Sequence, residues 1–373
     1  LTPSEQRTVR PDLGLNVYGY VYEEIRVREH KRHLFASLMA DGIPYTVVPV
    51  NDSVRGQQVV VTDVGPGGAV FAVDIVGVNA DVFPQFVEHF GRSAFAGRHT
   101  IGLWAWEVED FPDWMARSAE FVDEVWANSS FSAAAIARKI DPPTVPFPLP
   151  IAAPEVRIRC RAELGLPEGP LFMFCCDVDS IIRRKNPEAV VRSFVQAFSE
   201  GEGPALLIKT VNGERHGDEM ESLFRAAGNR RDVIIKDGYV PAEEQGALMD
   251  SCDVYVSLHR SEGFGLTLAE AMALGQPVIA TGYSGNLDFM TATNSYLVPY
   301  EMVSVGVGCE PYPASAEWAE PDVEAAADLM RHVVADPEEA RTVGMSARDE
   351  VERLHGPQVR GRFIRDRLLE VLG

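Results

Sequence analysis

Apolar and polar positions along the chain form blocks that switch between two periods. A continuous apolar run such as Leu171–Cys176 is typical of a strand buried on both faces of a parallel sheet. Such runs alternate with segments in which apolar residues recur every three or four positions, the spacing of an amphipathic helix. This alternation predicts an α/β protein built from doubly wound parallel sheets.

The expected strands fall into two sets on either side of a proline-dense break at residues 141–150. The first set is Leu15–Tyr20, Tyr45–Val48, Val70–Val78, Thr100–Leu103 and Glu124–Ala127; the second is Leu171–Cys176, Ala205–Lys209, Val233–Lys236, Val254–Leu258, Val278–Thr281 and Tyr296–Val298. A chain of 373 residues is long enough for two domains. We therefore predict domains at residues 1–150 and 151–356, an irregular loop at Glu301–Ser315 and an amphipathic helix within residues 357–373.

The stretch from residue 260 to 281 concentrates the signals of a binding site. Gly263 and Gly265 follow an apolar strand, and a helix is expected to begin near Leu266. The first amides of a helix have no internal partner and attract anions. Glu262 on the turn and Glu270 one turn into the helix could accept hydrogen bonds from sugar and ribose hydroxyls. An ordinary strand-to-helix loop is the alternative interpretation.

This stretch resembles the Glu-x7-Glu motif of retaining GT-B glycosyltransferases of family 4 (group 1). The resemblance is close over residues 172–299 and weaker in the first half. It implies two Rossmann-like domains facing a central cleft, with the last helix crossing back to the first domain. It also implies metal-independent transfer of a hexosyl or N-acetylhexosaminyl group from a UDP- or GDP-type donor to a small-molecule or glycan acceptor.

The resemblance assigns roles to individual residues. Glu262 would contact the donor sugar and Glu270 the ribose. The turn that binds the pyrophosphate would comprise Gly263, Phe264, Gly265, Leu266 and Thr267. The backbone of Tyr239 and Val240 would read the nucleobase, which leaves the base unspecified.

Basic residues at strand ends are the expected diphosphate ligands, because the leaving diphosphate needs its charge stabilised. Arg184 and Lys185 match the basic pair of the family best, with Arg183 as a shifted alternative. A solvated basic helix start is the other interpretation. Lys209, at the end of the next strand, is a second candidate that could equally be an exposed side chain.

Asp177-Val178-Asp179 reproduces a D-x-D sequence that binds metal in another glycosyltransferase fold. Its position directly after a strand and beside the basic pair favours salt bridges or loop capping instead. We expect no metal and no cofactor beyond the nucleotide sugar itself.

In the first domain, Trp104, Trp106 and Glu107 end an expected strand. Aromatic faces suit sugars, and a carboxylate can take a hydroxyl proton. A subgroup of the family has a similar Trp-x-Trp-Glu. Core packing is the alternative for the tryptophans. Asn79, Asp81 and Asn286 are further candidates on the sugar and acceptor side.

The segment from Glu23 to His30 departs from the family. Many relatives have a glycine-rich loop there, whereas this chain has Arg26 and Arg28. Arginine blocks close backbone approach but can bind an anion through two hydrogen bonds. The departure keeps two alternatives open: a pseudo-glycosyltransferase, and a catalytically silent nucleotide-sugar-binding protein of the same fold.

Composition and charge limit the kinds of binding partner that the protein can have. A net charge of −21 argues against nucleic acid, which requires clustered Lys and Arg. No run of 18 apolar residues is present, so we expect no membrane-spanning segment. The five cysteines lack ligand spacing and indicate a reducing, cytoplasmic setting. The expected partners are a nucleotide sugar and its acceptor; a homodimer is left open.

Overall fold

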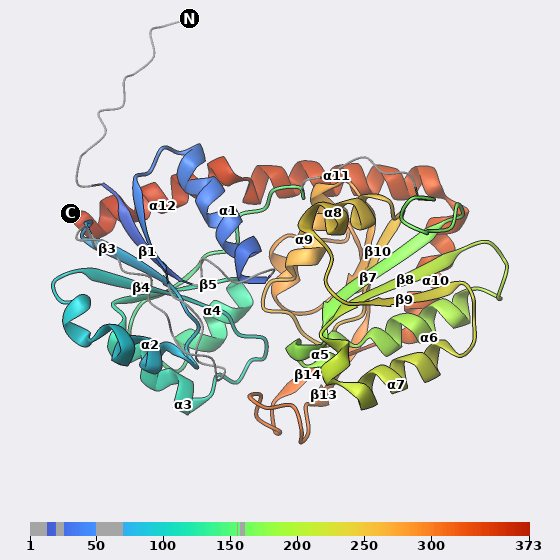
Figure 1. Cartoon of the computed structure of the whole chain (residues 1–373), viewed down its shortest axis with the longest axis horizontal. Helices are drawn as coiled ribbons and strands as arrows, with labels where there is room; N and C mark the ends of the chain where they lie inside the picture. Colours follow the sequence, from blue (N-terminus) through green and yellow to red (C-terminus); the bar gives the residue numbers. More distant parts are fainter. Residues whose placement is uncertain (1–12, 20–25, 50–69, 155, 157–160) are drawn as a thin grey trace, which may run out of the picture.

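The computed structural model describes residues 13–19, 26–49, 70–154, 156 and 161–373 (Figure 1). Each half contains a parallel six-stranded sheet covered by helices. The first sheet has the order β2-β1-β3-β4-β5-β6. Its strands are β1 (Leu15–Gly19), β2 (Tyr45–Pro49), β3 (Val73–Gly77), β4 (His99–Trp104), β5 (Glu124–Ala127) and β6 (Thr144–Pro146).

The second sheet has the order β12-β11-β10-β7-β8-β9. Its strands are β7 (Leu171–Asp177), β8 (Ala205–Val211), β9 (Val233–Asp237), β10 (Val254–Ser257), β11 (Val278–Thr281) and β12 (Tyr296–Val298). All seven residues of β7 are buried, as expected for a central strand covered on both faces. The predicted α/β class and the doubly wound sheets are confirmed.

The chain order places the β7–β10 pair at a topological switch point. From β7 the chain adds β8 and β9 on one side, and then β10, β11 and β12 on the other. In open α/β sheets, ligands bind beyond the carboxyl ends of strands at such a point. The loops after β7 and β10 contain residues 178–185 and 258–265, which are therefore placed beside each other.

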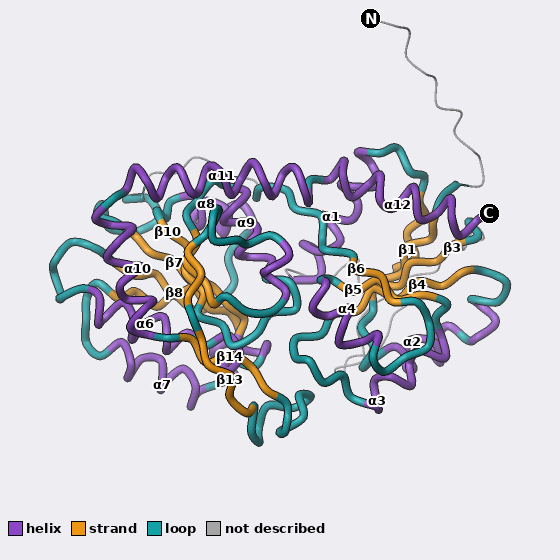
Figure 2. The backbone as a smooth tube through the Cα atoms, turned by 180° about the vertical axis from the view of Figure 1, so that it is seen from behind, coloured by secondary structure: helices purple, strands orange, loops and turns teal. Residues whose placement is uncertain are grey.

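Helices cover both sheets (Figures 1 and 2). The first half has α1 (Arg26–Ala40), α2 (Phe83–Phe90), α3 (Asp113–Ala116) and α4 (Ser130–Ala137); the second has α5 (Ile182–Lys185), α6 (Pro187–Ala197), α7 (Gly217–Ala227), α8 (Ala242–Asp250), α9 (Leu266–Ala273), α10 (Val323–Ala335), α11 (Pro337–His355) and α12 (Pro357–Leu372). Among the described residues, no helix is both long and apolar enough to cross a bilayer.

The last two helices run along one side of both sheets (Figure 1). α11 packs against α9, and α12 packs against α1 of the first half. A Cβ on Gly361 would lie 2.4 Å from the backbone oxygen of Ser37, so glycine permits this close helix contact. Arg367 of α12 donates two hydrogen bonds, each 2.9 Å, to the buried carboxylate of Glu124 on β5.

The segment expected to be an irregular loop contains a β-hairpin, which corrects that expectation. β13 (Tyr300–Ser304) pairs antiparallel with β14 (Glu317–Pro321). Four of the five β13 residues are exposed, and Val303 is half-buried. Its apolar residues Tyr300 and Met302 are exposed, so the strand has no continuous buried run like those of the two sheets. We call residues 300–321 the inserted hairpin, because the chain leaves the second sheet after β12 and returns directly to α10.

Candidate functional site

The loop between β10 and α9, residues 258–265, is shaped by its glycines. Gly265 has a φ of +89° and precedes the first residue of α9, a conformation that residues with a side chain rarely adopt. A Cβ on Gly285 would lie 2.1 Å from the backbone oxygen of Gly263. Residues 262–263 and 284–286 are therefore in direct backbone contact, and Gly285 N donates to Glu262 O at 2.9 Å.

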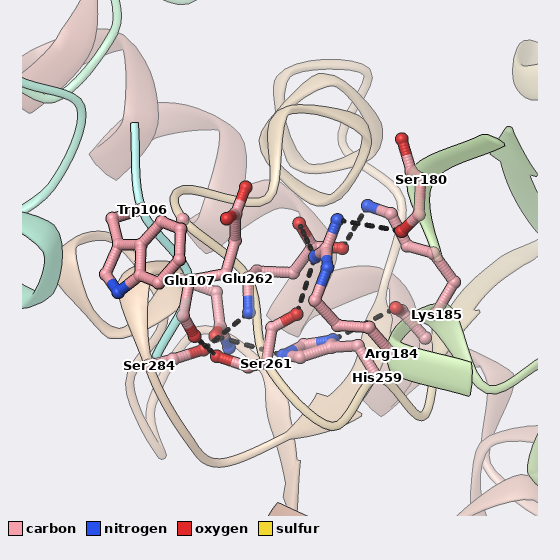
Figure 3. Close-up of polar contacts among 12 residues, drawn as sticks. Trp106, Glu107, Ser180, Arg184, Lys185, His259, Ser261, Glu262 and Ser284 are labelled. Carbon is pink, nitrogen blue, oxygen red and sulfur yellow. Dashed lines mark hydrogen bonds and ion pairs between the residues drawn. The ribbon is translucent and has the colours of Figure 1, made fainter. Parts of the chain in front are cut away.

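Glu262 is the centre of a buried ionic cluster (Figure 3). Its Oε1 accepts a hydrogen bond from Lys185 Nζ, and its Oε2 lies 3.2 Å from Arg184 Nη1. Burial disfavours the charged carboxylate, but Lys185 and Arg184 outweigh burial and hold the pKa of Glu262 well below its usual range. The sequence-predicted basic pair and the first glutamate are thus in contact.

Arg184 and Lys185 are not equivalent. Arg184 is 4% exposed and donates to the backbone oxygens of Ser261 at 2.7 Å and Ser180 at 3.4 Å. Its guanidinium therefore ties the β7 loop to the β10 loop. The Lys185 side chain is 14% exposed and is the more accessible cation of the two. Arg183, the shifted alternative, points elsewhere and donates to Val305 O and Val307 O.

His259 is hydrogen-bonded to residues on both sides of the loop. It is fully buried, with Nδ1 3.0 Å from Ser257 Oγ and Nε2 3.2 Å from Asn286 Oδ1. Burial lowers the pKa of His259 to about 4, so the ring is neutral near pH 7. The predicted site residue Asn286 is completely buried and donates to Thr281 O. Asn286 therefore positions the loop through His259.

Glu270, the second glutamate, lies on α9 and is 4% exposed. Its Oε1 is 3.6 Å from His33 Nε2 on α1 of the first half. The two acids of the motif therefore contact different elements. His33 was not among the expected site residues, because nothing near it in the sequence indicates a contact 237 positions away.

Glu107 and Trp106 reach this cluster from the first half (Figure 3). Ser261 Oγ donates to the backbone oxygen of Glu107. Trp106 is 1% exposed and its ring lies 5.2 Å from that of Tyr312. Trp104 does not reach the cluster: its indole is buried against Phe83 and Phe111. Trp106 also packs against Phe111 in the same buried cluster, so the core-packing alternative describes both tryptophan side chains.

The remaining candidates of the first half lie near the end of β3. Asn79 Oδ1 accepts a hydrogen bond of 2.9 Å from Ala105 N, and so fixes the β4 loop that carries Glu107. Asp81 is half-buried in the turn before α2. The backbone of α1 begins at Arg26, but the side chains of Arg26 and Arg28 lie outside the described part of the structure.

The candidates after β8 and β9 form a second group. Lys209 Nζ donates to the backbone oxygens of Thr210 and Gly238, and burial lowers its pKa. Tyr239 is 52% exposed and its hydroxyl donates to Asn212 Oδ1 at 2.9 Å. Val240 is half-buried and packs against the buried apolar residues of the second half. These residues brace the loops at the edge of the sheet that follow β8 and β9.

Two further expectations concern side-chain direction. Phe264 is 3% exposed and packs against Phe289, with ring centroids 5.0 Å apart, so it offers a ligand only its backbone. Leu266 and Thr267 are half-buried at the start of α9.

The D-x-D sequence lies directly after β7. Asp177 accepts from Asp179 N and from Asn212, while Asp179 pairs with Arg215 and His216. These are the loop capping and salt bridges expected for the D-x-D sequence.

Sequence reasoning missed Tyr312 of the inserted hairpin. Its hydroxyl donates to Glu107 Oε2 at 3.0 Å, and the residue is 7% exposed. The two residues are 205 positions apart. No local signal marked Tyr312, because the segment around it has neither helical nor strand periodicity.

Comparisons with known proteins place these features in a family context. Residues 157–304 match the family model described as "Glycosyl transferases group 1". The D-inositol 3-phosphate glycosyltransferase of Arthrobacter sp. (strain FB24) is 34% identical over 140 residues, 37% of this chain and 32% of that protein. The 2-deoxystreptamine glucosyltransferase of Streptomyces kanamyceticus is 30% identical over 139 residues, covering 37% and 34%. The chain spans about a third of the length of the curated relatives it matches.

Solved structures resemble nearly the entire chain. Sucrose-phosphate synthase from Thermosynechococcus elongatus aligns with a TM-score of 0.69 and 17% identity over 96% of this chain and 99% of that one. Anabaena HepE in complex with UDP and glucose aligns with a TM-score of 0.64 and 13% identity over the same shares. The chain therefore has the GT-B fold, and its residues 157–304 are similar in sequence to group 1 glycosyl transferases.

Proposed function

We propose that the protein is a retaining, metal-independent glycosyltransferase that moves a hexosyl or N-acetylhexosaminyl group from a nucleotide-diphospho-sugar to an acceptor hydroxyl. The observation that carries the proposal is the convergence of Lys185 and Arg184 on Glu262 directly before the N-terminus of α9. Cations and free helix amides together suit a diphosphate. The carboxylates suit the hydroxyls of a sugar and a ribose.

The unequal burial of the two cations divides their proposed roles. Arg184 is held by two backbone carbonyls, and so it orients Glu262 and Ser261. Lys185 is more exposed and is the direct diphosphate contact, together with the first amides of α9. Glu262 holds the donor sugar, and Glu270 holds the ribose.

For the chemical step we propose a front-face reaction. The bond between the anomeric carbon and the leaving phosphate oxygen breaks, and the acceptor oxygen bonds to that carbon on the same face. The acceptor proton passes to the leaving phosphate oxygen. The cations and the α9 amides stabilise the negative charge that develops on the diphosphate, and Glu107 lies on the acceptor side.

The acceptor class is a small molecule or a glycan. The relatives act on different partners by name, an inositol phosphate and an aminocyclitol among them. HepE has been solved with UDP and glucose, which makes UDP the first nucleotide to test.

The test is calorimetric titration of the protein with UDP, GDP and dTDP, with and without EDTA. We expect one nucleotide to bind, unaffected by EDTA. Lys185→Ala should weaken that binding by about 1.5–3 kcal/mol, the scale of a hydrogen bond to a charged group. Arg192→Ala is the matched control, because Arg192 is an exposed cation on the following helix α6.

Equal affinity in wild type and Lys185→Ala would place the diphosphate elsewhere. Equal weakening by Arg192→Ala would indicate a nonspecific charge effect. Loss of binding in EDTA would contradict metal independence. Retention is tested separately by NMR, because hydrolysis of the α-linked donor should release the α-anomer of the sugar first.

A further inference from the structure

The inserted hairpin, residues 300–321, is fixed to both loops that form the ionic cluster. Ala319 N donates to Arg260 O at 2.9 Å, and Arg260 Nε lies 2.6 Å from Glu320 Oε2. The side chain of Arg183 donates to Val305 O and Val307 O. Trp318 lies beneath both guanidinium groups, 5.7 and 6.0 Å from them. Arg183 is adjacent to Arg184 in the chain, and Arg260 is two positions before Glu262. The contacts of Arg183 and Arg260 therefore hold the hairpin close to the ionic cluster.

The tip of the hairpin extends into the first half of the molecule. Val305, Cys309, Tyr312 and Trp318 belong to the same buried cluster as Trp106 and Phe111. Tyr312 is 7% exposed, and its ring packs edge-on against Trp106. Packing of the Tyr312 ring against Trp106 and the other residues of this cluster therefore places its hydroxyl at Glu107.

The hydroxyl of Tyr312 is a proton donor under ordinary conditions. Burial, above all, and then the negative charge of Glu107 raise its pKa well above the usual value, while the nearby Arg184 acts in the opposite direction. The phenol therefore keeps its proton and donates it to Glu107 Oε2, at 3.0 Å. Because the backbone oxygen of Glu107 also accepts a hydrogen bond from Ser261 Oγ, Tyr312 meets Glu107 where the loop before α9 contacts the first half.

We propose that Tyr312 is a positioning residue: its phenol, delivered by the inserted hairpin, holds the Glu107 carboxylate in place beside the Arg184–Glu262 pair. Glu107 itself carries the acceptor-side role in the proposed function, on which this inference rests. Tyr312 acts only through Glu107. Without the phenol, the carboxylate can rotate away from the position in which it meets the acceptor.

The experiment compares Tyr312→Phe, Glu107→Gln and the double variant. Activity is followed as hydrolysis of UDP-, GDP- or dTDP-sugars, with water as the acceptor. Tyr312→Phe keeps the ring against Trp106 and should lower kcat roughly ten- to a hundredfold, as for a lost hydrogen bond to a charged group. The donor KM should stay unchanged. The double variant should be no slower than Glu107→Gln, because the two residues act as one unit.

Tyr300→Phe is the matched control, since Tyr300 is on the same hairpin, is 38% exposed and contacts Tyr283 rather than Glu107. Its kcat should equal that of the wild type. A wild-type kcat in Tyr312→Phe, or a double variant slowed by the product of the two single effects, would overturn the proposal. So would a raised donor KM at unchanged kcat.

Thermal unfolding separates this inference from the proposed function. The melting-temperature shifts of Tyr312→Phe and Glu107→Gln should fail to add in the double variant, whether or not the protein hydrolyses any donor. Non-additive shifts without nucleotide binding would retain the Tyr312–Glu107 pair and refute the proposed function. Additive shifts would refute the pair even if nucleotides bind.

Discussion

The loop before α9 and the inserted hairpin meet at the same ionic cluster but are specified in different ways. The loop spans residues 258–265, contains Gly265 at positive φ and leads directly into a buried helix. The hairpin spans residues 300–321, has an exposed first strand and contributes through Tyr312 and Trp318, which are buried against distant elements. The conformation of the loop depends on its own backbone, whereas the position of the hairpin depends on packing against distant residues.

This difference indicates which changes should be tolerated. Replacing a residue of the loop alters the backbone amides and the charge that would face the donor. Replacing a residue of the hairpin alters how firmly the acceptor side is held. We therefore expect the loop to affect nucleotide binding and donor cleavage, and the hairpin to affect turnover only where a residue contacts Glu107, as Tyr312 does.

The largest expected effect separates two carboxylates that are both paired with arginine. Glu262→Gln should lower transfer or donor hydrolysis by about 100-fold or more, the scale of a lost preorganised electrostatic group. Glu320→Gln removes the carboxylate that pairs with Arg260 from the hairpin side and should change turnover by less than about tenfold. Steady-state kinetics of the two variants would break the comparison if the losses were equal.

A smaller effect is expected at Gly265, whose positive φ suits glycine but not a residue with a side chain. Gly265→Ala places a Cβ at positive φ and 2.8 Å from Leu268 Cδ1, which should weaken nucleotide diphosphate binding by about tenfold, the equivalent of one hydrogen bond. Gly201→Ala is the control, because Gly201 has a φ of +80° with nothing within 4 Å of a Cβ. It should lose about 1 kcal/mol of stability and no affinity. Calorimetry on both variants measures the difference.

The last effect is on stability, not on affinity or turnover, and concerns the support of the loop by His259. An unfolded histidine titrates near pH 6.5, whereas burial lowers the pKa of folded His259 to about 4. Between these values the unfolded state binds more protons, so the free energy of unfolding falls as pH decreases, by about 2 kcal/mol at pH 5. Above pH 7 this contribution is constant.

Urea unfolding of His259→Gln at pH 7 and pH 5 measures that contribution. The variant should show a smaller loss of the free energy of unfolding on acidification than the wild type. Glu262 does not affect this comparison. Its lowered pKa stabilises the folded protein, and that contribution is lost only as the pH falls below the unfolded pKa of a glutamate, roughly 4.3. An unchanged slope in His259→Gln would show that its ring is protonated or accessible in the folded protein.

The sequence predicted the parts of the site that lie within one strand-loop-helix unit. Gly265, Glu262 and Glu270 were identified because strand, glycine turn and helix follow one another within about 20 residues. The basic pair at Arg184 and Lys185 was identified by its place after a buried strand. Trp104 shows the limit of this reasoning, because an alternating strand pattern does not determine which of its faces is covered by helices.

The sequence by itself determined the two parallel sheets, since the period of apolar positions follows from local backbone geometry. The order of the strands within each sheet, and with it the switch point, came from the tertiary structure. Only the tertiary structure decided that Lys185 and Arg184 contact Glu262, that His33 lies beside Glu270, and that Tyr312 donates to Glu107. These contacts join residues 77 to 237 positions apart. The physical reason is that such pairs form when whole elements pack, and packing depends on the shape and burial of both partners, which no local period records.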